Sequence, residues 1–282
     1  MGSLQPLDPA ASPLSYYGSE LRRLREAADL SQVQLSESIY CANTLVSQVE
    51  TTRRIPTRDF SERIDAALRT DGHFSRLVSL VLRSQLPSWF QEYAEMEARA
   101  AYISTFQSQL IYGLLQTEEY ARAVLATGVP DDLDTLVAAR MERQRILEGA
   151  RPPLALVVLD EAVLYRPIGG PAVMRAQLNR LLDFATNRWT RVQVLPFAVG
   201  QHASLAGSFN VLRFDDDPDI VYTEDLISGH MTANSDTIRE ASLRYASLQA
   251  AALSVEDSAV LIARVMEERY GNRPRTEGCA VA

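Results

Sequence analysis

The sequence contains no lysine, only two cysteines and no apolar run long enough to span a membrane. We interpret the absence of lysine as a GC-rich coding bias, which points to an actinobacterial source. Cys41 and Cys279 match no metal-binding or disulfide spacing. The longest apolar runs, LALVVL and VQVLPF, are strand-sized, whereas a spanning helix needs about 18 apolar residues. No signal-like segment opens the chain, so we expect a cytoplasmic protein without membrane association.

The chain of 282 residues carries a net charge of −8, which excludes a protein with positive potential over its whole surface. Residues 16–69 hold eight arginines and eight acidic residues, so this segment is neutral and the remainder carries the deficit. A neutral segment can still bind phosphates if its arginines gather on one face. The length is enough for two domains, each with its own core.

We expect a multidomain protein with an all-α helix-turn-helix domain followed by a larger α/β (α+β) domain. The expected divisions are a flexible tail at 1–15, the helical domain at 16–84, the α/β domain at 85–270 and a second flexible tail at 271–282. Apolar residues at helical spacing predict five short helices in the first domain. In the second, strands expected at 155–160, 191–197, 209–214 and 219–224 alternate with helices or form a hairpin around DDDP.

Residues 31–54, SQVQLSESIYCANTLVSQVETTRR, fit two short helices with a turn between them. Leu35, Ile39, Val46 and Val49 would lock the pair together. The later helix of this pair, which is the third helix of the domain, then turns short polar and amide side chains outward. Amides can form two hydrogen bonds with adenine. We therefore predict base contacts from Asn43, Thr44 and Gln48. Contacts with the DNA backbone are predicted from Gln32, Ser47, Arg53 and Arg54.

Periodicity alone leaves a second interpretation open, because many helical bundles with a polar outer face never bind DNA. The residue order LSQVQLSESI…VSQVETTRRIP, however, resembles the XRE (lambda and 434 repressor-like) helix-turn-helix family. The matching positions are Gln32 at the start of the second helix, Glu50 at the end of the third and Pro56 after the basic turn. The resemblance implies that Arg25 and Glu50 form a buried structural ion pair. Tyr40 departs from the pattern, because the family usually has glycine there, and a bulky residue is costly if φ is positive.

The larger domain carries a second resemblance, in the phrases PSWFQEYAEMEARA, QLIYGLLQTEEYARAVL, VVLDEAVLYRPIGGPAVMRAQL, VQVLPFAVGQHASLAGSFNVLRF and IVYTED. These look like the C-terminal domain of a large actinobacterial group of XRE regulators, described as a domain of unknown function or as antitoxin-like, with WhiJ as a developmental example. The resemblance implies a transcription factor that is often paired with a small acidic protein encoded nearby.

Candidate site residues in the larger domain are Asp160 and Glu161 at a strand end, His202 in a glycine-flanked loop, and the aromatic residues Trp89 and Tyr112. They could line a pocket for a small effector, or the domain could bind a protein partner. Strand-end acids also commonly cap helices, loop histidines are mostly solvated, and the aromatic rings could belong to the core. The sequence has no phosphate loop, nucleophile elbow or metal-ligand cluster, so we expect no enzyme activity, metal or cofactor.

The preferred interpretation is a sequence-specific regulator that binds double-stranded DNA as a homodimer, because a single small helix-turn-helix makes few base contacts. The alternative is an antitoxin-like interaction module that binds a small partner protein, with DNA binding secondary or vestigial.

Overall fold

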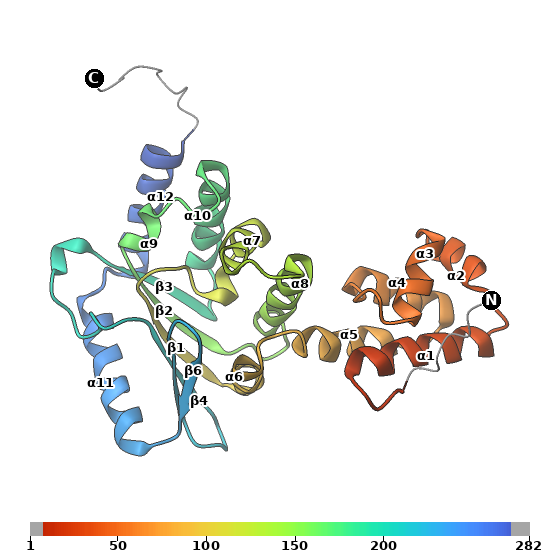
Figure 1. Cartoon of the computed structure of the whole chain (residues 1–282). Coiled ribbons are helices and arrows are strands. Elements are labelled where there is room, and N and C mark those ends of the chain that lie inside the picture. Colours follow the sequence, from red (N-terminus) through yellow and green to blue (C-terminus); the bar gives the residue numbers. More distant parts are fainter. Residues whose placement is uncertain (1–7, 272–282) are drawn as a thin grey trace. The chain divides into compact units, whose positions relative to one another are not determined.

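The computed structural model of the chain describes residues 8–271 and divides them into two compact units (Figure 1). The first unit comprises the chain up to Gln91 together with Asp134–Glu142, and the second comprises Glu92–Leu133 and the chain from Arg143 onward. The expected domain boundary after residue 84 stays a prediction. Of the two expected tails, residues 1–7 and 272–282 lie outside the described residues. Residues 13–15 are helical rather than part of a tail, because Ser12 caps a helix that starts with proline.

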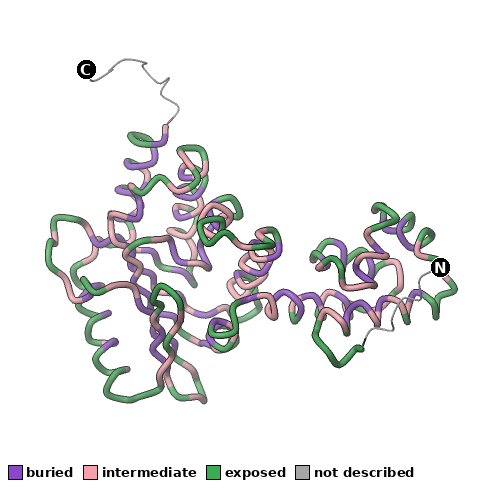
Figure 2. Tube along the Cα trace, in the orientation of Figure 1, coloured by how far each residue is buried: buried purple, intermediate pink, exposed green. Residues whose placement is uncertain are grey.

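The first unit contains five consecutive short helices, as the apolar spacing predicted. Each helix turns apolar side chains inward, and Figure 2 shows this alternation of buried and exposed positions along the trace. Tyr17, Leu21, Leu35, Ile64 and Phe74 form part of a fully buried core. The helices are α1 (Pro13–Ala27), α2 (Gln32–Ser38), α3 (Asn43–Glu50), α4 (Arg58–Leu68) and α5 (His73–Arg83), and α6 (Ser88–Arg99) follows across the boundary between the units.

Gly18 allows α1 to approach the end of α3 closely. A Cβ atom placed on Gly18 would lie 2.9 Å from the carbonyl oxygen of Val49 and 3.2 Å from that of Glu50. Real Cβ contacts of this length with a backbone oxygen do not occur without a shift of the helix. The glycine therefore sets the separation between α1 and α3, and with it the position of α3 in this unit.

The second unit is built around a mixed six-stranded sheet in the order β3-β2-β1-β4-β5-β6. β1 runs parallel to β2, and β2 runs parallel to β3, whereas β4, β5 and β6 continue the sheet in antiparallel fashion from β1. This arrangement confirms the expected α/β class and the hairpin around DDDP. The strands are β1 (Tyr102–Gln107), β2 (Leu154–Asp160), β3 (Thr190–Leu195), β4 (Phe209–Arg213), β5 (Ile220–Glu224) and β6 (Gly229–Thr232).

Helices and short helical turns complete the second unit. α11 packs against the sheet, where Ala241, Tyr245 and Leu248 share a core with Phe106 and Val158. The hydroxyl of Tyr245 donates to the carbonyl oxygen of Leu156, so this polar group is satisfied inside the core. The helices are α7 (Glu118–Leu125), α8 (Leu133–Gln144, which crosses the boundary between the units), α9 (Ala162–Tyr165), α10 (Pro171–Ala185), α11 (Ser235–Ala251) and α12 (Val255–Tyr270).

No single helix among residues 8–271 is both long enough and apolar enough to cross a membrane. α11 and α12 satisfy the length and composition criteria only when they are taken together, and they are bent by 68° where they join.

Candidate nucleic-acid interface

The helix pair α2 and α3 is held together by the apolar residues that the sequence predicted. Leu35, Val46 and Val49 are fully buried, and Ile39 is 2 % exposed. Ser31 begins α2 with a capping box, because its hydroxyl accepts from the Gln34 N–H while the Gln34 side chain accepts from the Ser31 N–H. The start of α2 and the packing of α3 against it are therefore both specified locally.

The carboxylate of Glu50, at the end of α3, joins three elements of the first unit. Arg25 of α1 donates from Nε to Oε1 at 2.5 Å and from Nη2 to Oε2 at 3.0 Å, and Gln32 of α2 donates to Oε2 at 2.7 Å. The Nε of Arg22 lies 3.6 Å from the same carboxylate. Hydrogen bonding to Glu50 raises the pKa of Arg25 above its ordinary value. The buried ion pair implied by the family resemblance is thus confirmed.

The opposite face of α3 is polar and open to solvent. Asn43 and Thr44 are exposed, and Ser47 and Gln48 are half-buried one turn later on the same face. The Oδ1 of Asn43 accepts from the hydroxyl of Ser36 at 2.6 Å, which fixes the side chain and leaves its NH₂ group as the donor that can turn outward. The four polar residues predicted for α3 are therefore brought together on one face.

The predicted backbone contacts fall into two groups in the structure. Arg53 and Arg54 are exposed, and neither guanidinium forms an ion pair with another described residue. The backbone N–H groups of both residues donate to the carbonyl oxygen of Gln48, so the chain reverses directly after α3. Gln32, in contrast, already uses its amide to hold Glu50. No local pattern in the sequence marks this pairing, and a phosphate contact from Gln32 stays a prediction that would need its second amide hydrogen.

Tyr40 occupies the turn between α2 and α3 in the left-handed region, with φ at +54°. The side chain is 90 % exposed. The turn therefore demands the positive φ at which a bulky residue is costly. The overall geometry of α2 and α3 is nevertheless kept, because Leu35, Ile39, Val46 and Val49 remain buried between them.

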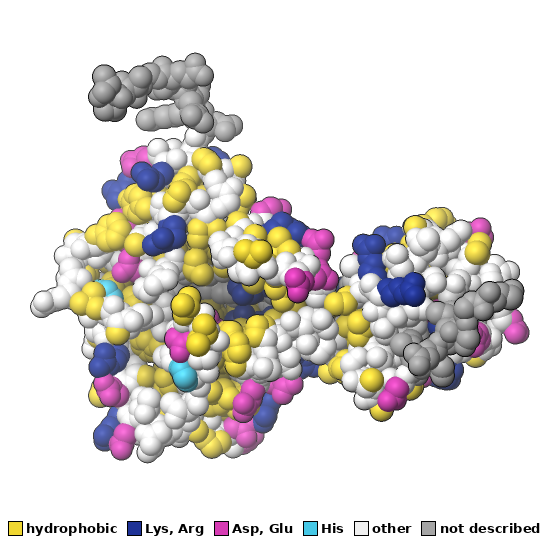
Figure 3. Space-filling view, viewed as in Figure 1, with side chains coloured by type: hydrophobic (Ala, Val, Ile, Leu, Met, Phe, Trp, Pro, Cys, Tyr) yellow, Lys and Arg dark blue, Asp and Glu magenta, His cyan; other side chains and the backbone are white. Residues whose placement is uncertain are grey.

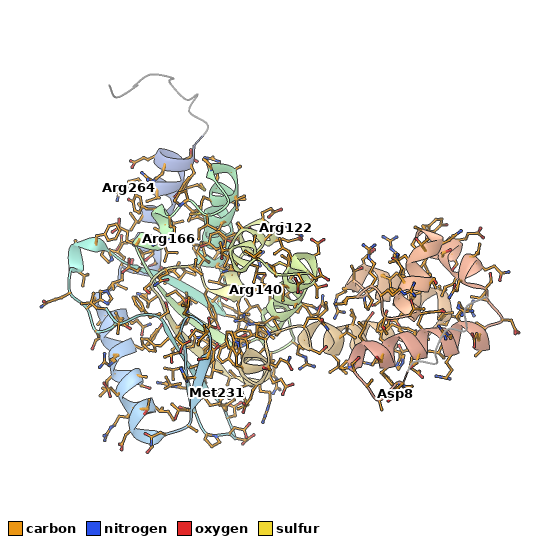
Figure 4. The ribbon with its side chains drawn as sticks, in the orientation of Figure 1. Asp8, Arg122, Arg140, Arg166, Met231 and Arg264 are labelled. Atoms are coloured by element: carbon orange, nitrogen blue, oxygen red, sulfur yellow. The ribbon has the colours of Figure 1, made fainter. Side chains whose placement is uncertain are left out.

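Exposed arginines occur in both units, so basic side chains alone do not identify a DNA-binding face. In the first unit, arginines gather over part of the face seen in Figure 3. In the second unit, Arg166 and Arg264, labelled in Figure 4, are exposed as well. What distinguishes the first unit is a polar helix face flanked by unpaired guanidinium groups at Arg53 and Arg54.

Three of the candidates in the larger domain lie close together at the end of β2. Asp160 Oδ2 lies 3.8 Å from His202 Nε2, and Asp160 Oδ1 accepts from the N–H of Ala162 at 2.9 Å. Glu161 accepts from the N–H of Phe197 at 2.7 Å. Both carboxylates therefore accept hydrogen bonds from the backbone around them, in line with the alternative interpretation that strand-end acids commonly cap helices.

Tyr112 and Trp89 are placed elsewhere. Tyr112 is 3 % exposed and donates its hydroxyl to the buried Glu97, which also accepts from Tyr93 and is paired with Arg143. Burial raises the pKa of Tyr112 well above its ordinary value. Trp89 is 39 % exposed and belongs to the other compact unit. Tyr112 thus belongs to the core, as the alternative interpretation of the aromatic rings expected, and its polar network is not marked by any local pattern in the sequence.

A separate cavity of about 350 Å³ opens between α11 and the sheet in the second unit. Its apolar floor includes Phe209, Val221 and Ala241, and Glu224 and Glu240 line it as well. None of the five residues predicted for a pocket lines this cavity.

Comparison with known families identifies both parts of the chain. Residues 17–76 match a family described as a helix-turn-helix domain, and residues 90–264 match a family described as a domain of unknown function (DUF5753). Neither the curated proteins nor the solved structures contain a significant match to the chain. The helix-turn-helix match indicates a DNA-binding regulator, and its position coincides with the polar face of α3.

Proposed function

Since the chain belongs to the DUF5753 family and carries a helix-turn-helix domain before it, we propose that it is a sequence-specific transcriptional regulator of the XRE type. The observation that supports this best is the two-sided character of α3. Val46, Val49 and Glu50 are buried and fix the helix, while Asn43 and Thr44 are exposed on its opposite face. A short helix held this firmly, with polar side chains outward, is suited to enter a major groove.

In the proposed complex the two groups of side chains have different roles. Asn43, Thr44 and Gln48 contact base edges, since amide groups pair with adenine and threonine can bond either base type or touch a thymine methyl. Arg53 and Arg54, together with Ser47 and Gln32, contact phosphates, which position the helix without reading sequence. Glu50 and Arg25 hold the fold and do not touch DNA.

The active species is proposed to be a homodimer that acts on DNA in the cytoplasm, associated with the nucleoid. One helix-turn-helix reads only a few base pairs, and two copies on adjacent half-sites supply the specificity that a regulator needs. We assign dimerisation to the larger domain, because most apolar residues of the first unit are buried in its own core.

The larger domain is proposed to respond to a protein partner or a small ligand. The cavity beside α11 is of a size that admits a small molecule. The turn between β5 and β6 presents Leu226 and Ile227, which are 98 % and 81 % exposed, and such adjacent apolar side chains suit a protein contact. The same turn favours a second candidate function, an antitoxin-like module that binds a small acidic protein encoded nearby. Neither function requires catalysis.

Selection of duplexes from a random 30-base-pair library by the purified full-length protein tests the proposal. Enrichment of one sequence, with half-sites related by twofold symmetry, is the expected result. If no sequence is enriched while the protein binds a neighbouring small protein tightly, the interaction module is the correct function. Loss of enrichment in an Asn43→Ala, Gln48→Ala double variant, with unchanged thermal stability, would assign the base contacts to α3.

A further inference from the structure

The turn after α2 is closed by two hydrogen bonds that require a left-handed residue between them. The N–H of Tyr40 donates to the carbonyl oxygen of Glu37 at 3.2 Å, and the N–H of Cys41 donates to that of Ser36 at 3.0 Å. This pattern is a Schellman motif, in which the residue in the left-handed conformation is most often glycine. Tyr40 takes the position of that glycine.

Three other helices of the first unit end in a similar way. Asp29 after α1, Thr52 after α3 and Arg69 after α4 also have positive φ, between +53° and +58°. All three are polar or charged residues for which exposure to water costs little. Tyr40 alone among the four places a large aromatic ring on the surface of this unit, where it is 90 % exposed.

Neither the conformation nor the exposure of Tyr40 stabilises the fold. A residue with a Cβ atom is strained in the left-handed region, and an aromatic ring in water contributes no burial energy. The side chain of Tyr40 forms no hydrogen bond or ring contact with another described residue. A glycine would serve the turn better, so the side chain must be explained by something outside the folded chain.

The surroundings of Tyr40 indicate what that partner is. The turn leads in three residues to Asn43, the first residue of the polar face of α3. Arg63 lies beside the turn, where its Nη1 donates to the carbonyl oxygen of Ile39 at 3.4 Å while its other side pairs with the exposed Asp59. An exposed phenol on a turn that a guanidinium group also contacts, and that leads into the polar face of α3, is suited to a phosphate oxygen, which accepts hydrogen bonds from tyrosine hydroxyls.

We propose that Tyr40 contacts the backbone of double-stranded DNA beside the groove that α3 enters, with its hydroxyl donating to a phosphate and its ring covering the adjacent sugar. This inference rests on the proposed DNA-binding function and adds a residue to it. The side chain strengthens binding to every sequence, and it carries no charge, so it does not contribute to counterion release.

Two substitutions of Tyr40 in the full-length protein test the inference. Tyr40→Gly should raise the unfolding midpoint of the helix-turn-helix domain by roughly 2–6 °C, because glycine removes the backbone cost. It should weaken binding about three- to tenfold, both to the duplex that the wild type selects and to a scrambled duplex of the same length. Tyr40→Phe keeps the ring and should lose part of that affinity. In both variants the salt dependence of binding should keep the wild-type slope.

Val129→Gly is the matched control. Val129 is also exposed (86 %), uncharged and left-handed, with φ at +48°, but it belongs to the second unit. This variant should bind both duplexes like the wild type.

The outcomes separate this inference from the function on which it rests. A wild-type protein that selects no duplex overturns both. A wild type that selects a duplex, combined with a Tyr40→Gly variant that binds it equally well, overturns the role of Tyr40 alone. Weakening confined to the selected duplex overturns the phosphate assignment, since a backbone contact acts on all sequences.

Discussion

Arg25 and Glu50 form a two-pronged ion pair, with Nε 2.5 Å from Oε1 and Nη2 3.0 Å from Oε2, that ties the first helix to the end of the third. Glu50 is fully buried, and Gln32 supplies a further hydrogen bond to it. A carboxylate that is satisfied in this way fixes the three helices relative to one another. The orientation of the polar face of α3 depends on this contact.

Replacing Glu50 with glutamine should destabilise the first unit by about 3–5 kcal/mol, because the buried Arg25 would keep only the exposed Glu26, 3.4 Å away, as a counter-charge. Urea unfolding followed by circular dichroism measures the change. Asp59→Asn is the control, since the side chains of Asp59 and its partner Arg63 are 70 % and 47 % exposed, and an exposed pair contributes less than about 1 kcal/mol. Equal losses in the two variants would show that the buried pair has no special role.

Gln48→Ala should weaken binding to the selected duplex by about 1–3 kcal/mol and relax the preference at one base position. Quantitative binding to a set of single-base variants of that duplex measures both effects. If affinity for the selected and scrambled duplexes falls equally, Gln48 does not read bases.

Arg54→Ala should weaken binding to all duplexes and lower the slope of log affinity against log salt by about one unit, because one fewer counterion is released. Titrations at several salt concentrations give the slope. Arg23→Ala is a suitable comparison, as Arg23 is occupied by Glu20. A slope that Arg54→Ala leaves at the wild-type value would remove Arg54 from the phosphate contacts.

Asp65 should make the stability of the first unit depend on pH. Burial acts to raise the pKa of Asp65, but hydrogen bonds from Ser75, Thr70 and the N–H of Phe74 outweigh it, so the pKa lies below its ordinary value. The folded state therefore favours the charged form. The resulting stability is complete above the unfolded pKa of about 4 and is lost as the pH falls through the lower folded pKa.

The measurement compares wild type with Asp65→Asn at pH 7 and pH 3. At pH 7 the substitution should cost about 1–3 kcal/mol, since it weakens the bonds that begin α5, and the difference should narrow at pH 3. Asp59→Asn, at a carboxylate that is 70 % exposed, should change stability little at either pH. If Asp65→Asn lowers the free energy of unfolding equally at pH 7 and pH 3, the ionisation of Asp65 does not contribute to stability.

The sequence predicted those parts of the fold whose signals are local. The cap at Ser31 and the helical spacing of Leu35, Val46 and Val49 depend only on residues close together in the sequence. In agreement with these signals, α3 begins at Asn43 and ends at Glu50. β1 was missed because its Ser104 and Thr105 are polar although buried, and their partners lie far along the chain, as when Thr105 bonds Asn210. β6 was missed because four residues give no alternation.

The candidate sites divide in the same way. The polar face of α3 follows from helical periodicity, so it could be listed from the sequence. The pairing of Gln32 with Glu50, 18 residues apart, and the network of Glu97 with Tyr93, Tyr112 and Arg143 depend on tertiary packing, and no local pattern marks them.

The left-handed residues that end α1, α3 and α4 also show that the thermal stability of this small domain can be increased. Asp29, Thr52 and Arg69 each hold a conformation that glycine adopts at lower cost, at positions outside the apolar core. Substituting glycine at these three positions should give a more thermostable domain for crystallisation or biosensing, and it leaves the core packing unchanged.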